Sequence, residues 1–185
     1  MENLKKDCIN LARKAIENYL EGKQTVEIPK DTNKELLENK SGVFVTLEKN
    51  GQLRGCVGTF LPTQKNIATE IVYSAIAATQ DPRFEPLKKD EWKDVSVIVY
   101  LLDKPEPVSK IEELDPKKYG VIVVSAENPQ KIGLLLPNIE DIKTPEEQVF
   151  VAVQKAQIDP EKEGLIIYKF SAKIFKEKDE KQKDS

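Results

Sequence analysis

Two short segments of this sequence combine residue types that could do chemistry. The first is Leu53–Phe60, which places Arg54 and Cys56 two positions apart among glycines. Alternation along a strand would put these two side chains and Gly58 on one face of a sheet. A nearby guanidinium can hold an anion and lower the pKa of a thiol, and the thiolate is the reactive form of cysteine. The segment therefore indicates either a nucleophilic thiol or a structural role, in which Cys56 is a small buried residue and Arg54 binds a carboxylate.

The second segment is Asp81–Phe84, in which Arg83 follows an aspartate–proline pair. Only three of the 29 basic residues are arginine, and two of them lie in these segments. The planar guanidinium makes paired hydrogen bonds to a carboxylate or phosphate, which an ammonium cannot make. Arg83 and Arg54 would form a small anion clamp if the fold brings them together. In the alternative interpretation the segment is a rigid turn, with Asp81 bonding backbone amides and Phe84 filling the core.

The bulk composition narrows the kinds of partner. A net charge of −3 over 185 residues argues against nucleic acid as the main partner. No apolar run approaches the roughly 18–20 residues that span a bilayer, and the first residues lack the apolar core of a secretion signal. We therefore expect a cytoplasmic protein without a membrane partner. The sequence contains no histidine, which removes a histidine base and a Cys/His zinc site, so neither a metal nor a cofactor is expected.

The first segment lies on the second strand of a predicted β-hairpin. Gly42–Glu48 alternates between apolar and polar residues, and Asn50-Gly51 is the dipeptide most typical of a two-residue hairpin turn. Gln52–Phe60 is then the returning strand. Counted from this turn, the predicted cross-strand pairs are Val45–Cys56, Leu47–Arg54 and Val43–Gly58.

The order hairpin, helix, strand is predicted twice along the chain. In the first case a helix over Thr63–Thr79, with Thr63 as its N-cap, precedes a strand at Val95–Leu102. In the second, the hairpin Val121–Pro137 precedes a helix opened by the capping box at Thr144–Glu147, and the last strand is Gly164–Phe175. This indicates a structural duplication, although the residues themselves barely match.

The predicted class is α+β, with a mainly antiparallel sheet and flanking helices. The duplicated units, residues 43–102 and 121–175, would form two unequal sub-domains with a cleft, preceded by a helix over residues 3–21. Together they make one domain over residues 1–175. The charged residues 176–185 are expected to be a disordered tail.

These motifs resemble a known family. The stretch Leu53-Arg54-Gly55-Cys56-Val57-Gly58-Thr59-Phe60 is very similar to the signature of the AMMECR-type domain family, also known as protein A of the AmmeMemoRadiSam system. Asp81-Pro82-Arg83-Phe84 resembles its second signature. The C-terminal half of the family is matched by Gly133–Pro137, Glu146–Gln148 and Lys155-Ala156, so the likeness covers about Leu4 to Phe175.

The resemblance implies an α+β fold of two unequal parts, with the arginine–glycine–cysteine (RGC) motif near the cleft. It also implies an intracellular role beside a Memo-like protein and a radical-SAM protein. Relatives often carry a histidine around the position of Glu48, so a mechanism that needs a histidine base is in doubt for this chain. The family's motif positions fall on Arg54, Gly55, Cys56, Gly58, Thr59, Asp81, Arg83 and Phe84.

We therefore expect an enzyme or enzyme subunit that binds a small anionic ligand, with Cys56 as the candidate catalytic residue. The alternative is a non-catalytic protein-interaction module for the Memo-like and radical-SAM proteins. A nucleic-acid-associated factor is the least favoured reading, because the chain is acidic and lacks an aromatic-rich basic face.

Overall fold

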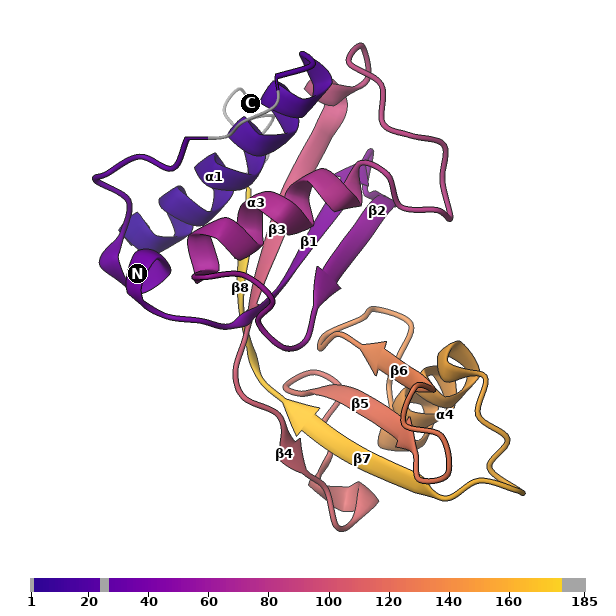
Figure 1. Ribbon diagram of the computed structural model, residues 1–185. Helices are drawn as coiled ribbons and strands as arrows, with labels where there is room; N and C mark the ends of the chain where they lie inside the picture. Colours follow the sequence, from indigo (N-terminus) through magenta and orange to yellow (C-terminus); the bar gives the residue numbers. More distant parts are fainter. Residues whose placement is uncertain (1, 24–26, 178–185) are drawn as a thin grey trace, which may run out of the picture. The chain divides into compact units, whose positions relative to one another are not determined.

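The computed structural model describes residues 2–23 and 27–177 of this chain. They divide into two compact units, each built on an antiparallel sheet with helix packed against it (Figure 1). The first unit contains the described residues up to 102 together with those from 173 onward, and the second contains residues 103–172. The predicted α+β class is confirmed. No helix within residues 2–23 and 27–177 has the length and apolar character needed to cross a bilayer.

In the first unit, two long helices lie side by side over one face of a four-stranded sheet (Figure 1). The strand order is β2-β1-β3-β8, with β2 at one edge. The elements are α1 (Glu2–Leu20), α2 (Lys34–Glu38), β1 (Gly42–Lys49), β2 (Gln52–Thr59), α3 (Ile67–Ala78), a 3-10 turn (Trp92–Asp94), β3 (Val95–Leu102) and β8 (Ala172–Lys176).

The core of this unit follows from the two periodicities of its sequence. Alternate residues of β1, namely Val43, Val45 and Leu47, are fully buried beneath the helices. One stripe of α1 faces them, and it includes Cys8, which is fully buried. Burial raises the pKa of the Cys8 thiol to about 12, so this cysteine is an inert core residue, as its helical spacing predicts.

The second unit is smaller and has one α-helix on its sheet. The strand order is β4-β7-β5-β6, and α4 packs on β5 and β6. The predicted capping box at Thr144 is present, with Glu147 accepting from its backbone. The elements are β4 (Glu106–Pro107), a 3-10 turn (Ile111–Glu113), β5 (Gly120–Ser125), β6 (Ile132–Leu135), α4 (Pro145–Ala156) and β7 (Leu165–Phe170).

Two predicted elements differ from the observed ones. The single strand predicted at Gly164–Phe175 is broken at Ser171 into β7, in the second sheet, and β8, in the first. The helix predicted from Thr63 begins at Ile67 and is capped by Asn66. Periodicity shows neither difference, because an unbroken apolar pattern continues across both boundaries.

The chain remains ordered slightly beyond the start of the predicted tail. Lys176 ends β8, and the backbone N–H of Glu177 donates to the carbonyl of Val97 at 3.0 Å. The carboxylate of Glu177 also pairs with Arg13 at 2.9 Å, which fastens the last strand to α1. The remainder of the predicted tail, residues 178–185, lies outside the described residues.

The two units repeat the same plan with a constant spacing. Each has a hairpin, a 12-residue helix and a strand, and their sheets share the order of equivalent strands. Shifting residues 42–82 by 78 positions superimposes α3 on α4 without a gap, so that residue 67 falls on residue 145. The identical residues are Gly42, Val43, Val45, Asn50, Gln52, Gly55, Lys65, Ala78, Asp81 and Pro82, which recur at positions 120, 121, 123, 128, 130, 133, 143, 156, 159 and 160.

One repeated glycine explains how the helix approaches the hairpin. A Cβ atom on Gly55 would lie 2.3 Å from the carbonyl oxygen of Ala78, at the end of α3. A Cβ on the equivalent Gly133 would lie 1.8 Å from the carbonyl oxygen of Ala152 in α4. Both distances are shorter than any real contact, so each helix lies on its strand only because that strand carries a glycine there.

Replacing either glycine by alanine should therefore destabilise the protein. We expect Gly55→Ala and Gly133→Ala each to lower the free energy of unfolding by about 3 kcal/mol, because backbone must move to admit the methyl group. Chemical denaturation measures the loss. Gly164→Ala is the control, since its Cβ would come no nearer than 3.3 Å, to the Cβ of Ala126. Equal losses in all three variants would contradict this account.

Candidate functional site

The RGC motif lies on β2, but its pairing with β1 differs from the predicted register. β1 skips Arg54, which becomes the extra residue of a β-bulge. The observed pairs are Thr46–Cys56 and Phe44–Gly58, in place of Val45–Cys56 and Val43–Gly58. The predicted register was wrong because a count from the turn assumes an unbroken ladder, whereas a bulge inserts one residue into one strand only.

The bulge decides which side chains lie on which face of the sheet. Gly55 faces the helices, as its approach to α3 shows. Cys56 lies on the opposite, helix-free face with its partner Thr46. The Thr46 hydroxyl donates to the Cys56 Sγ atom at 3.1 Å. The thiol is partly buried and Thr46 is 6% exposed, so this contact is sheltered from water.

The second predicted segment binds directly to the backbone of Cys56. Asp81 follows α3 and is 3% exposed, and its Oδ2 atom accepts from the Cys56 backbone N–H at 2.8 Å. The Arg83 Nη2 atom donates to the Cys56 carbonyl at 3.3 Å. Both main-chain groups of Cys56 are therefore occupied at the edge of the sheet, where no further strand follows β2 in the described sheet.

Asp81 and Arg83 also bind each other. The Arg83 guanidinium donates to both carboxylate oxygens, at 3.0 and 2.6 Å, and the Arg83 backbone N–H adds a bond of 3.1 Å. These hydrogen bonds from Arg83, with that from Cys56, lower the pKa of Asp81 to about 2 against the opposing effect of burial. Asp81 is thus a buried carboxylate that stays ionised through most of the acid range.

Arg54 is engaged by a different carboxylate. Its Nη2 and Nε atoms donate to Glu91 at 2.6 and 3.3 Å, and both side chains are 16% exposed. Lys49 also donates to Glu91, at 3.0 Å. Hydrogen bonds from Arg54 are the largest cause of a Glu91 pKa lowered to about 2. This pairing is the structural role that the sequence analysis gave as the alternative for Arg54. No described contact joins Arg54 to Arg83, so the two arginines bind separate carboxylates.

Thr59, the last residue of β2, is bound to a third buried carboxylate. Its hydroxyl donates to Glu70 at 2.9 Å, and Glu70 is 1% exposed. The same carboxylate accepts from the hydroxyl and the backbone N–H of Thr63 and from the N–H of Gln64. Thr63 was predicted as an N-cap and instead belongs to this loop, which Glu70 holds against the sheet.

The last two predicted site residues, Gly58 and Phe84, have packing contacts. A Cβ on Gly58 would lie 2.0 Å from the carbonyl oxygen of Val43 and 2.7 Å from the Phe44 side chain, so β1 leaves no room for a side chain there. Phe84 is half-buried and its backbone N–H donates to the Asp81 carbonyl at 3.0 Å. The Arg83 guanidinium lies 5.6 Å from the centre of its ring.

The structure thus brings Cys56, Asp81 and Arg83 together and places Arg54 and Thr59 in neighbouring networks of their own. Sequence reasoning missed Thr46, Glu70, Glu91 and Tyr100. The missed carboxylates come from a helix and a loop whose distance from β2 no local pattern encodes. In the part of the chain that the structure describes, no three Asp, Glu or Cys side chains are grouped closely enough to hold a metal ion.

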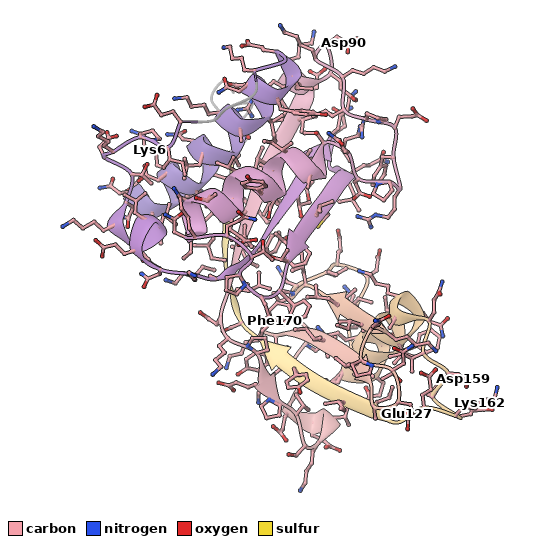
Figure 2. The ribbon with its side chains drawn as sticks, in the orientation of Figure 1. Lys6, Asp90, Glu127, Asp159, Lys162 and Phe170 are labelled. Atoms are coloured by element: carbon pink, nitrogen blue, oxygen red, sulfur yellow. The ribbon has the colours of Figure 1, made fainter. Side chains whose placement is uncertain are left out.

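The repeat in the second unit separates residues that the fold needs from residues that it does not. Gly55, Asp81 and Pro82 recur at positions 133, 159 and 160. Asp159 makes the same local turn as Asp81, since its Oδ1 accepts from the N–H two residues on, and its Oδ2 pairs with Lys162 (Figure 2). By contrast, the positions of Arg54, Cys56 and Arg83 are occupied by Ile132, Leu134 and Glu161.

Comparison with known proteins identifies relatives along nearly the whole chain. A model of the AMMECR1 family matches residues 9–175. A protein of Thermotoga maritima is 48% identical over 170 residues, which is 91% of this chain and 96% of that protein. A protein of Clostridium acetobutylicum is 47% identical over 171 residues, 91% of this chain but only 36% of that protein. The crystal structure of an uncharacterised protein from Pyrococcus horikoshii has a TM-score of 0.84 at 34% identity, covering 92% of this chain and 90% of that one.

The depressed pKa of Asp81 predicts how stability responds to acid. A carboxyl group whose pKa is lower in the folded state stabilises that state above about pH 4, and this contribution is lost as the pH falls towards 2. We expect Asp81→Asn to lower the free energy of unfolding by about 2 kcal/mol at pH 7 and to reduce its fall between pH 5 and pH 2. Urea denaturation at each pH measures both effects.

Asp159→Asn is the matched control, because it makes the same change at the equivalent position of the second unit. The Asp159 side chain is 43% exposed, so its loss should cost well under 1 kcal/mol. A pH dependence in Asp81→Asn as steep as in the unsubstituted protein would contradict the role given to Asp81.

Proposed function

This chain belongs to the AMMECR1 family, and we propose that it is an enzyme, or an enzyme subunit, that binds a small anionic ligand beside Cys56. The proposal places it in the cytoplasm, with Cys56 as the candidate reactive group. The observation that carries it is the position of Arg83, a half-exposed cation held on the backbone of the residue that bears the thiol.

The Arg83 side chain is exposed enough to contact a ligand while it stays paired with Asp81. Its side chain is 52% exposed, although its partner Asp81 is almost fully buried. Among the described residues, Nε and Nη2 have hydrogen bonds and Nη1 has none. The two bonded nitrogens fix the plane of the guanidinium, so Nη1 can donate to a phosphate or carboxylate oxygen without a further ordering cost.

Arg54 receives a different role in this proposal. Its bidentate bond to Glu91 leaves it little exposed, so a ligand would have to displace that carboxylate to reach it. We assign Arg54 to holding the bulge in β2, which sets the face on which Cys56 lies. Gly55, Gly58, Thr59, Asp81 and Phe84 then shape the surroundings of the thiol.

The second unit supports a functional reading of the arginine and the thiol. It keeps the glycine and the Asp-Pro turn but carries leucine and glutamate in place of Cys56 and Arg83. The plan shared by the two units therefore folds without these two side chains. Their presence in the first unit needs another reason, and ligand binding supplies one.

A thermal-shift titration with inorganic phosphate at constant ionic strength tests the proposal. We expect the midpoint of unfolding to rise with phosphate, because a ligand that binds only the folded state stabilises it. Arg83→Gln should abolish most of this rise relative to the variant's own midpoint, and Arg83→Lys should retain part of it.

Arg13→Gln is the control for the loss of one arginine. Arg13 also pairs with a carboxylate, that of Glu177, and packs over Trp92 with the guanidinium 4.3 Å from the ring centre. It should leave the phosphate response unchanged. A response that persists in Arg83→Gln, or no response in the unsubstituted chain to phosphate or to succinate, would overturn the proposal.

A second candidate function is a non-catalytic interaction module for the Memo-like and radical-SAM proteins. One observation favours it: Phe150 on α4 is 63% exposed. The equivalent residue of α3 is Val72, which is 7% exposed and packs in the core that α1 and α3 share. The second unit has no helix equivalent to α1, so its aromatic residue is left where a covering helix lies in the first.

The long relative from Clostridium acetobutylicum supports the same candidate. This chain covers 36% of that protein, so the domain is joined there to a large additional segment. The same domain fills 96% of the Thermotoga maritima relative, and domains that are joined in one relative and separate in another often bind each other. We therefore assign Phe150 as the anchor of such a contact.

Binding of the purified Memo-like protein, measured by calorimetry with Phe150→Asp, tests this candidate. We expect the substitution to weaken binding at least tenfold, because a charge would replace the buried aromatic anchor. Tyr73→Asp is the control, since Tyr73 is an aromatic residue on α3 of the first unit and is 60% exposed. Equal affinity for Phe150→Asp and the unsubstituted protein would exclude this surface.

A further inference from the structure

The helix-free face of the first sheet carries a polar group beside the Cys56 thiol. The proposed function gives this group no role. Thr46 lies directly across from Cys56, and its hydroxyl donates to Sγ at 3.1 Å. Threonine is β-branched and therefore stiff at χ1, and this residue is only 6% exposed. The direction of its hydroxyl is thus fixed by the strand and by packing.

Tyr100 stands behind Thr46 on the same face. It lies on β3 opposite Phe44, diagonally across from Thr46, which pairs with Ile98. Burial raises the pKa of Tyr100 to about 12, so the phenol keeps its proton at neutral pH.

A donor aimed at sulfur acts differently on the two protonation states of the thiol. The thiolate is a strong hydrogen-bond acceptor and the neutral thiol a weak one. A fixed O–H donor therefore favours the charged form, in the same way that hydrogen bonds to a carboxylate favour its ionised form. The same contact also fixes the direction of Sγ.

The second unit gives an independent reason to assign this pair a function. By the 78-residue shift, the equivalents of Thr46 and Cys56 are Val124 and Leu134, which do not face each other: Val124 lies opposite Ile132, and Leu134 lies opposite Ile122. The tyrosine is retained as Tyr168, on the other side of Ile122. Valine has nearly the shape of threonine without the hydroxyl. The strand therefore accepts an aliphatic residue at this position, and the hydroxyl occurs only in the unit that also has the thiol.

We propose that Thr46 is a positioning residue for Cys56: its hydroxyl, which donates to Sγ at 3.1 Å, orients the sulfur and stabilises the thiolate. This inference rests on the proposed function, in which Cys56 is the reactive group. It adds one residue to the site that neither the signatures nor the arginine pattern indicates.

The rate of Cys56 alkylation by iodoacetamide, followed from pH 5 to pH 10 in the full chain, tests the inference. Peptide mass mapping separates Cys56 from the buried Cys8. We expect Thr46→Val to raise the midpoint of the rate profile by about one pH unit, which slows alkylation roughly tenfold below the midpoint. Thr46→Ser keeps the hydroxyl and should restore the original midpoint.

The outcomes distinguish this inference from the proposed function. If Cys56 in the unsubstituted, folded protein is not alkylated at any pH, the proposed reactive role fails and the inference fails with it. If Cys56 is alkylated but Thr46→Val and Thr46→Ser share one profile, only the role of Thr46 is overturned. Thr46→Ala gives a second hydroxyl-free variant should Thr46→Val fold poorly, and circular dichroism at each pH confirms that the protein stays folded.

Discussion

Asp81 is a carboxylate that the fold buries and must therefore satisfy with hydrogen bonds. Its donors come from the backbone of Cys56 and from both the backbone and the guanidinium of Arg83. These bonds tie the turn after α3 to the edge of β2. Gly55 is the condition for them, since only a residue without a side chain lets the end of α3 come so near the strand. The two candidate segments, Leu53–Phe60 and Asp81–Phe84, are thus joined into one structural unit.

The backbone and the side chain of Cys56 have different partners in this arrangement. The backbone N–H and carbonyl are bound by Asp81 and Arg83, which occupies the edge of β2 at this point. The side chain is left to the helix-free face, where Thr46 contacts it. A cation, a thiol and a hydroxyl thereby lie within one or two contacts of each other while the strand itself stays fixed.

The repetition of the fold within one chain acts as an internal comparison. Gly55 is kept in both units because each helix comes against its strand where a side chain would clash, and the aspartate is kept at the turn that follows each helix. Positions that differ carry the polar chemistry of the first unit, including Arg54 and Thr46, which become aliphatic in the second. Asp81 and Asp159 make the same turn, but among the described contacts only Asp81 also binds the neighbouring strand.

The fold class, the order of hairpin, helix and strand in each unit, and the segments that hold Cys56 and Arg83 could be predicted from local sequence. Periodicity and turn dipeptides act over a few neighbouring residues, so they need no knowledge of distant contacts. The bulge at Arg54, the break at Ser171 and the pairing of Arg54 with Glu91 come from the tertiary fold. Each of these depends on contacts between residues far apart in the chain. The 78-residue repeat leaves only ten identical residues between the two units, so the equivalence of α3 and α4 in the fold is needed to recognise it. A buried position constrains the volume and hydrophobicity of its side chain more strictly than the residue type, so two similar folds can share few identical residues.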